Sequence, residues 1–234
     1  MTRHELKEQL QHDRFTDTVS EVVGYAATHR KDLTRWIIIA IAVVAVAGGI
    51  FWYLRYQNSV RERDLNNAFA VAARPVGPAA PGAANSFPTE SAKTQAVTKA
   101  FSDVVAKDGG SKQGYIAEYY LGTLKAKNGD NQGAEAELAK AADSGSEIAP
   151  LAKVALAQLL AGDNKLPQAQ SLLQSIVDKP TDLVSKAQAE ILLARLDESS
   201  NPQQAKKMLQ TVSSDSKDPV VQRVAQQVSS ELNK

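Results

Sequence analysis

The sequence predicts an all-α protein: an N-terminal helix, a single transmembrane helix, and a C-terminal α-solenoid built from helical hairpins. Three observations lead to this fold class. An uncharged run of 19 residues extends from Trp36 to Leu54. From Glu90 onward, residues that favour helices dominate, and turn residues occur in clusters. In that part, a helix–turn–helix pattern recurs about every 35 residues.

The apolar run has the length and composition of a membrane span. As a helix, its 19 residues would extend about 28 Å, close to the thickness of the hydrocarbon layer. Ten of them are Ile, Val, Leu or Phe, which together favour insertion by about 3 to 6 kcal/mol. Trp36 lies at one end and Trp52 with Tyr53 at the other, where such rings prefer the headgroup region. We therefore predict a transmembrane helix over residues 36–54.

Two alternatives remain for this run. A cleavable signal sequence would be followed by a site of small residues, which Ala45-Val46-Ala47 resembles. However, a polar leader of 35 residues precedes the run, and the run continues past that site. A core helix of a soluble domain is the other alternative. If the helix stays in the membrane, Ala45 and Gly49 form a pair of small residues that would let another transmembrane helix approach closely.

The leader and the segment after the span are expected to be helical. Residues 1–35 carry apolar residues at roughly helical spacing, with a polar face of mixed charge that favours a partner-facing or solvated helix over a lipid-bound one. Residues 55–73 contain no helix breaker, so they should extend the membrane helix. Residues 74–89 contain four prolines and two glycines and must be a linker. This linker is either a loop between two helices of one repeat or a spacer.

Residues 90–234 form the predicted repeat domain. Apolar triads at positions i, i+4 and i+7 recur there after 35 and 36 residues, each preceded by a turn and an earlier helix. The first residue of each triad is small, because the two helices of a hairpin cross closely at that point. Pro219 begins a closing helix with a polar outer face, as expected for a cap. The triads are Ala134, Leu138 and Ala141; Ala169, Leu173 and Ile176; Ala205, Leu209 and Val212; and a weaker copy at Val97, Phe101 and Val104.

This pattern resembles the tetratricopeptide repeat. YIAEYYLG, followed by Ala134 and Leu138, is similar to that repeat, and Leu121-Gly122 matches its Leu-Gly pair. The resemblance implies that the first helix of each hairpin lines a concave protein-binding groove. Carried onto this sequence, the groove residues would be Tyr119, Thr123, Lys127, Val154, Gln158, Glu190, Ala194 and Asp197. Tyr119 and Tyr120 form an adjacent pair: either both pack in the core, or one packs there and the other is a candidate binding anchor.

The whole arrangement resembles a family of bacterial inner-membrane proteins, the YfgM-type ancillary subunits of the SecYEG translocon. The resemblance rests on a short leader, one membrane helix and a C-terminal repeat array of this size. It implies a cytoplasmic N-terminus, a periplasmic repeat domain, and partners among the Sec translocon subunits and a membrane-anchored periplasmic chaperone. The charges flanking the span are balanced and do not set the orientation, so this topology follows from the resemblance.

Composition excludes most chemistry. The chain has no cysteine, and its three histidines all precede the apolar run, so the repeat domain has neither thiolate nor imidazole for metal binding or nucleophilic catalysis. Residues 90–234 carry 17 Lys/Arg and 18 Asp/Glu, so no basic surface predicts nucleic-acid binding. We expect no enzyme activity and no cofactor.

The sequence therefore predicts a membrane-anchored protein–protein interaction module. Our leading interpretation is a component of the translocon and periplasmic chaperone network that assists export or folding of envelope proteins. The alternative is a scaffold for envelope assembly, in cell division or outer-membrane biogenesis, that would use the same groove.

Overall fold

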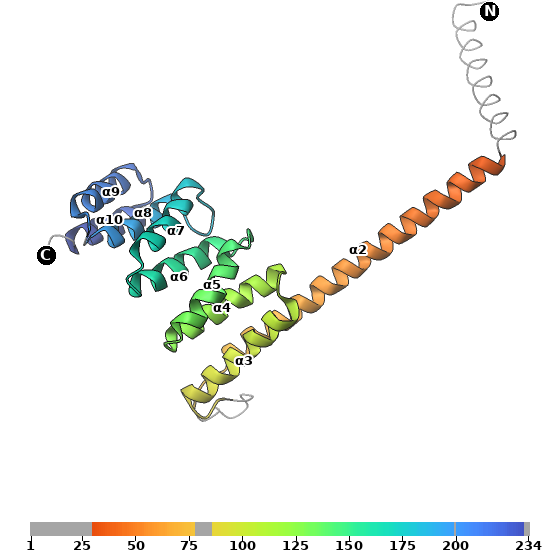
Figure 1. Cartoon of the computed structure of the whole chain (residues 1–234), viewed down its shortest axis with the longest axis horizontal. Helices are drawn as coiled ribbons and strands as arrows, with labels where there is room; N and C mark the ends of the chain where they lie inside the picture. Colours follow the sequence, from red (N-terminus) through yellow and green to blue (C-terminus); the bar gives the residue numbers. More distant parts are fainter. Residues whose placement is uncertain (1–29, 78–85, 199, 232–234) are drawn as a thin grey trace, which may run out of the picture. The chain divides into compact units, whose positions relative to one another are not determined.

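The computed structural model describes residues 30–77, 86–198 and 200–231, and the predicted leader helix lies almost entirely outside them. The described residues form helices and no strand, which confirms the all-α fold class. They divide into two compact units, Met1–Asn58 and Ser59–Lys234. In chain order the helices are α2 (Arg30–Ala72), α3 (Glu90–Asp108), α4 (Lys112–Lys127), α5 (Asn131–Asp143), α6 (Ala149–Gly162), α7 (Leu166–Asp178), α8 (Lys186–Asp197), α9 (Pro202–Asp215) and α10 (Pro219–Glu231) (Figure 1).

The first unit contains the apolar part of α2. Its large apolar side chains are exposed, with Trp36 at 70% and Val44 at 71%, so no described part of the unit covers them. Near the end of the apolar run, the rings of Trp52 and Tyr56 stack with centroids 5.9 Å apart. By length and composition this helix is a candidate membrane span. Exposing so much apolar surface to water would be costly, and a bilayer removes that cost.

The second unit begins with the last turns of α2. Leu65 and Ala68 are buried against Phe101 of α3 and against Ala117 and Leu121 of α4. These residues therefore form the first helix of the repeat unit, which starts at Ser59 and not at residue 90 as the sequence predicted. The sequence did not predict this earlier boundary, because the residues of α2 and α3 that contact each other are separated in sequence by a proline-rich segment.

The predicted linker over residues 74–89 connects α2 to α3, and these two helices share one buried core cluster. Its described ends pair through their backbones: Gly77 N–H donates to Phe87 O, and Phe87 N–H donates to Pro75 O, both at 2.9 Å. This closure brings the end of α2 to the start of α3. Thr89 then begins α3 by accepting a hydrogen bond from Ala92 N–H through its hydroxyl.

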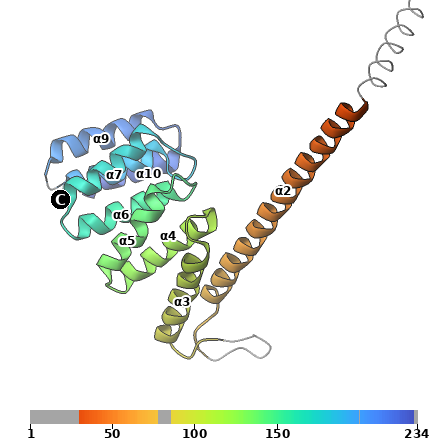
Figure 2. The same cartoon turned by 45° about the vertical axis from the view of Figure 1, so that its right-hand side comes forward.

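After this first hairpin, each helix packs on the next along the chain (Figure 2). The pairs α4/α5, α6/α7 and α8/α9 are the three predicted hairpins, and α10 closes the stack. All twelve residues of the four predicted triads are buried, which confirms the repeat period. Prolines occupy the first turns of α6, α7 and α9, where a missing N–H costs nothing.

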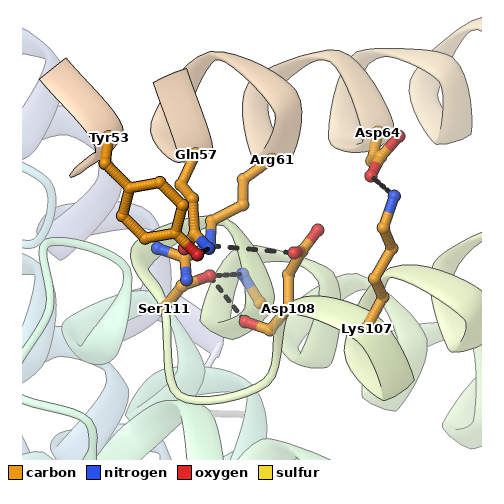
Figure 3. A network of polar contacts seen from close by, with 8 residues as sticks. Tyr53, Gln57, Arg61, Asp64, Lys107, Asp108 and Ser111 are labelled. Atoms are coloured by element: carbon orange, nitrogen blue, oxygen red, sulfur yellow. Dashed lines mark hydrogen bonds and ion pairs between the residues drawn. The ribbon is translucent and has the colours of Figure 1, made fainter. Parts of the chain in front are cut away.

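Polar contacts join α2, α3 and the start of α4. Arg61 lies 3.7 Å from the carboxylate of Asp108, and Lys107 pairs with Asp64 (Figure 3). The hydroxyl of Ser111 donates to Asp108 O at 2.6 Å and caps α4 by accepting from Gly114 N–H. These contacts fix the direction in which α4 leaves the first hairpin.

The Leu-Gly pair in α4 marks a close crossing of α4 and α5. A Cβ atom built on Gly122 would lie 2.7 Å from Leu138 Cγ and 3.2 Å from the Leu138 backbone nitrogen. Because both the side chain and the backbone of α5 occupy that space, only glycine lets the two helices approach this closely.

We predict that Gly122→Ala lowers the free energy of unfolding by about 1–3 kcal/mol, because the added methyl group overpacks the crossing. Gly162→Ala is the matched control, since nothing lies within 4 Å of a Cβ at that helical position. The control should leave stability unchanged or raise it slightly. Urea unfolding of the full chain in detergent, followed by circular dichroism, measures both; equal stability of the two variants would contradict the prediction.

A partly buried ion network connects α4 and α5. Lys125 and Lys140 donate to Glu137 at 2.9 and 3.2 Å, and the side chain of Glu137 is 12% exposed. Burial alone would raise the pKa of Glu137, but the hydrogen bonds from the two lysines outweigh it and hold the pKa below its ordinary value. Glu118, buried beside this network, has a raised pKa, chiefly because of its burial.

Because the pKa of Glu137 is lowered on folding, its ionised form stabilises the fold above the ordinary carboxyl pKa. We predict that Glu137→Gln lowers the free energy of unfolding by about 1–2 kcal/mol at pH 7. The difference from the wild type should shrink as the pH falls through the lowered pKa. Asp103→Asn, which removes the exposed pair with Lys99, should change stability little. A Glu137→Gln effect that stays constant down to pH 3 would refute this assignment.

Candidate protein-binding groove

The first helices of successive hairpins lie next to one another within the repeat unit. Besides the contacts between neighbours in sequence, α4 packs directly on α6, and α8 packs directly on α10. In stacked helical repeats this set of helices forms the inner, concave face. The candidate site lies on that face.

Two adjacent hollows make up what we call the concave groove. The larger has a volume of about 330 Å³ and lies between α6, α8, α10 and the turn before α8. The smaller, of about 230 Å³, lies between α6, α7 and α8. Leu192 and Arg195 line both hollows, which makes them one continuous surface. The lining residues are Leu151, Val154, Leu183, Val184, Gln188, Ile191, Leu192, Arg195 and Val224 in the larger hollow, and Ala157, Gln158, Ala161, Leu173, Leu192, Arg195 and Leu196 in the smaller.

The turn before α8 holds one wall of the groove in place. Thr181 N–H donates to Val184 O at 3.0 Å, and Val184 N–H donates to the Thr181 hydroxyl at 3.2 Å. Ser185 and Gln188 then form a reciprocal capping box that begins α8. Val184 is buried under this turn, whereas Leu183 is 48% exposed at the rim of the groove.

The groove is apolar apart from two glutamines and one charge. Among the described residues that line it, Arg195 is the one charged side chain. Its guanidinium lies 3.8 Å from the carboxylate of Glu231 at the end of α10, and both side chains are about half exposed. Such a surface excludes water from an apolar ligand and offers a single polar contact.

Two of the predicted groove residues lie on α6. Val154 lines the larger hollow and Gln158 the smaller. The three residues predicted from α4 line neither hollow. Tyr119 is half-buried against the main core cluster, the Thr123 hydroxyl donates to Tyr120 O at 2.8 Å, and Lys127 is exposed at the end of its helix.

The residues predicted from α8 are displaced from the groove. Ala194 is fully buried, Asp197 is buried and accepts a hydrogen bond from Gln170 at 2.5 Å, and Glu190 pairs with Lys186. The groove-lining residues are instead Ile191 and Arg195, one position later than the predicted Glu190 and Ala194. Successive side chains of an α-helix point about 100° apart, so a shift of one position moves a side chain off the groove-lining face.

Sequence reasoning also missed the turn and the closing helix. Leu183 and Val184 form an apolar pair inside an otherwise polar turn, a signal that could have identified them. Val224 lies on the cap helix, which was not considered as part of the groove. The turn before α8 and the closing helix both line the groove, because the turn forms part of its rim and α10 forms its end.

Two further predicted features can be located. Tyr120 packs its ring on Phe69 and Phe101, with centroids 4.9 and 5.4 Å away, although 38% of the residue is exposed. Ala45 and Gly49 lie on the exposed apolar part of α2, and a Cβ on Gly49 would meet nothing within 4 Å. A close helix–helix contact at this pair stays a prediction.

The described residues contain no group of three or more His, Cys, Asp or Glu side chains placed to hold a metal ion. The buried carboxylates Asp108 and Glu118 each have one oxygen without a hydrogen-bond partner. The groove combines a hollow shape, apolar surface and one cation.

Comparison with known proteins agrees with the fold. A family model described as a tetratricopeptide repeat-like domain matches residues 33–182, which is more than half of the chain. The match covers most of α2 and extends through α7, so it contains the α6 wall of the groove, while α8 and α10 lie beyond it. No curated protein and no solved structure matches the chain. On the strength of the family match and the stacked hairpins, the chain belongs to the tetratricopeptide repeat-like domain family.

Proposed function

We propose that this protein is a membrane-anchored interaction module that holds polypeptides in its concave groove beside the bacterial export channel. The observation that carries the proposal is the apolar groove of about 330 Å³ in a chain that also has a long, exposed apolar helix. Domains of this family are typically interaction modules, and a groove with one charge and no clustered acids or nucleophiles suits binding.

The membrane helix would act as the anchor. With the N-terminus in the cytoplasm, the helix crosses the inner membrane once and the repeats stand in the periplasm. The absence of cysteine from the chain is compatible with that oxidising compartment. Ala45 and Gly49 then offer a close-packing surface for a helix of the translocon.

The partner class follows from the groove and the anchor together. A polypeptide leaving an export channel is extended and exposes apolar side chains that are buried after folding. An apolar groove held at the membrane could bind such segments, or a chaperone that carries them. The Sec translocon and a membrane-anchored periplasmic chaperone are therefore the proposed partners, consistent with the resemblance to the YfgM-type subunits.

We predict that alkaline carbonate leaves the full chain in the membrane pellet, and that protease added to spheroplasts digests the repeat unit.

Val43→Asp combined with Val46→Asp should release the chain from the membrane, because each charge in mid-membrane costs about 3 kcal/mol against a total insertion free energy of about 3–6 kcal/mol. Gln203→Asp with Gln210→Asp adds the same charge to exposed repeat positions and serves as the control. Release of the wild-type chain by carbonate would refute the anchor, and protection of the repeats would refute the orientation.

The groove can be tested by site-specific photocrosslinking in cells. A crosslinking amino acid at Val154 should capture translocating polypeptides, the translocon or its periplasmic chaperone. The same amino acid at Gln210, exposed on α9 and outside the groove, is the matched control and should capture few of them. Equal capture from both positions, or capture of unrelated proteins alone, would count against the proposed function.

A further inference from the structure

The one charge among the described residues that line the concave groove is positive. The walls of the groove are aliphatic side chains, two glutamines and one guanidinium, and no acidic residue is among the described residues that line it. Arg195 lines both hollows, so a ligand occupying either one lies near the same positive charge. An apolar ligand with a negative charge would complement this surface, whereas one with a positive charge would meet a cation of like sign.

Arg195 has an exchangeable partner within the chain. Its distance of 3.8 Å to Glu231 is longer than a strong ion pair, and both side chains are half exposed. Glu231 is the last residue of α10, the helix that also places Val224 in the groove. The carboxylate thus stands at the rim of the groove, where an incoming acid could replace it.

We propose that the concave groove selects apolar protein segments that carry an acidic side chain, and that this acid displaces Glu231 from Arg195. The proposal rests on the function proposed above and names its ligand class. Arg195 is the specificity-determining residue, and Glu231 is an internal competitor that weakens binding of the same chemical group.

The dimensions of the groove limit the length of such a segment. Along α6 the lining runs from Leu151 to Ala161, a rise of about 15 Å. That length accommodates about four or five extended residues, or about three turns of a helix. With Arg195 in the wall shared by the two hollows, the acid belongs near the middle of the segment, with apolar residues on both sides.

The test uses the full chain in detergent micelles and short fluorescein-labelled peptides of Leu, Val and Ala with one central Asp. Matched peptides carry Asn or Lys at that position. Fluorescence anisotropy at low salt should show the Asp peptide binding about fivefold to tenfold more tightly than the Asn peptide, and the Lys peptide binding most weakly. The preference should fall as sodium chloride is added, because salt screens a half-exposed pair.

Variants assign this preference to named residues. Arg195→Gln should remove it, so that the Asp and Asn peptides bind with similar affinity, and Glu231→Gln should tighten binding of the Asp peptide severalfold. Arg223→Gln, on the exposed face of α10 and outside the groove lining, is the control for net charge and should change nothing. Circular dichroism confirms that each variant is folded, and Glu231→Gln tests the proposal even if Arg195→Gln unfolds.

The outcomes separate the two proposals. Binding that does not distinguish Asp from Asn, or a preference that survives Arg195→Gln, overturns the inference about acidic ligands and leaves the groove as a protein-binding site. If no peptide binds in the anisotropy experiment, and a crosslinking amino acid at Val154 captures no partner in cells, the proposed function is overturned. If light scattering shows that the chain associates with itself and Val224→Asp abolishes this, a second copy occupies the groove and the inference is wrong.

Discussion

The structure depends on one constraint: a single helical hairpin cannot bury its own apolar face. Each hairpin covers the next, so the stack requires something different at each end. At the C-terminal end, α10 buries Ala225 and Val228 against the last hairpin and leaves a polar surface outside. At the other end, the closing function falls to the last turns of α2, through Leu65 and Ala68. The helix that carries the candidate membrane span therefore also supplies a structural part of the repeat unit.

This use of α2 explains why the repeat unit starts earlier than the sequence indicated. The triads beginning at Ala134, Ala169 and Ala205 were predictable because a buried face recurs at helical spacing and at a constant repeat length. Gly122 was singled out through its match to the Leu-Gly pair of the tetratricopeptide repeat, and the structure gives the physical reason, since the crossing with α5 leaves no room for a side chain. Leu65, Ala68 and Ala72 also recur at helical spacing, but their partners lie beyond a proline-rich loop and follow no repeat. Helical spacing shows that a face is apolar, and it does not identify the distant segment that covers it.

The groove could be predicted only in part, and the reason is geometric. The repeat pattern named Val154 and Gln158 on α6, and both line the hollows, whereas none of the residues that it named on α8 does so. The edge of an apolar stripe is less well defined than its centre. The sequence analysis named Glu190 and Ala194, whereas the residues that line the groove are Ile191 and Arg195, one position later. This shift of one residue put an anion into the predicted set and left out the cation. The predicted electrostatic character of the site was therefore more fragile than its predicted location.

Floor and rim of the groove have different physical roles. Leu173, Val184 and Ile191 line the groove, but they are at most 7% exposed and belong to the packed clusters between the helices. Changing them would leave cavities in the stack, so the depth of the groove is coupled to the stability of the fold. Leu183 and Arg195 stand at the rim with roughly half of their surface exposed, and substitution there costs the fold little. A repeat protein of this kind can therefore change its ligand preference through a few rim side chains, while the same buried residues keep the groove open.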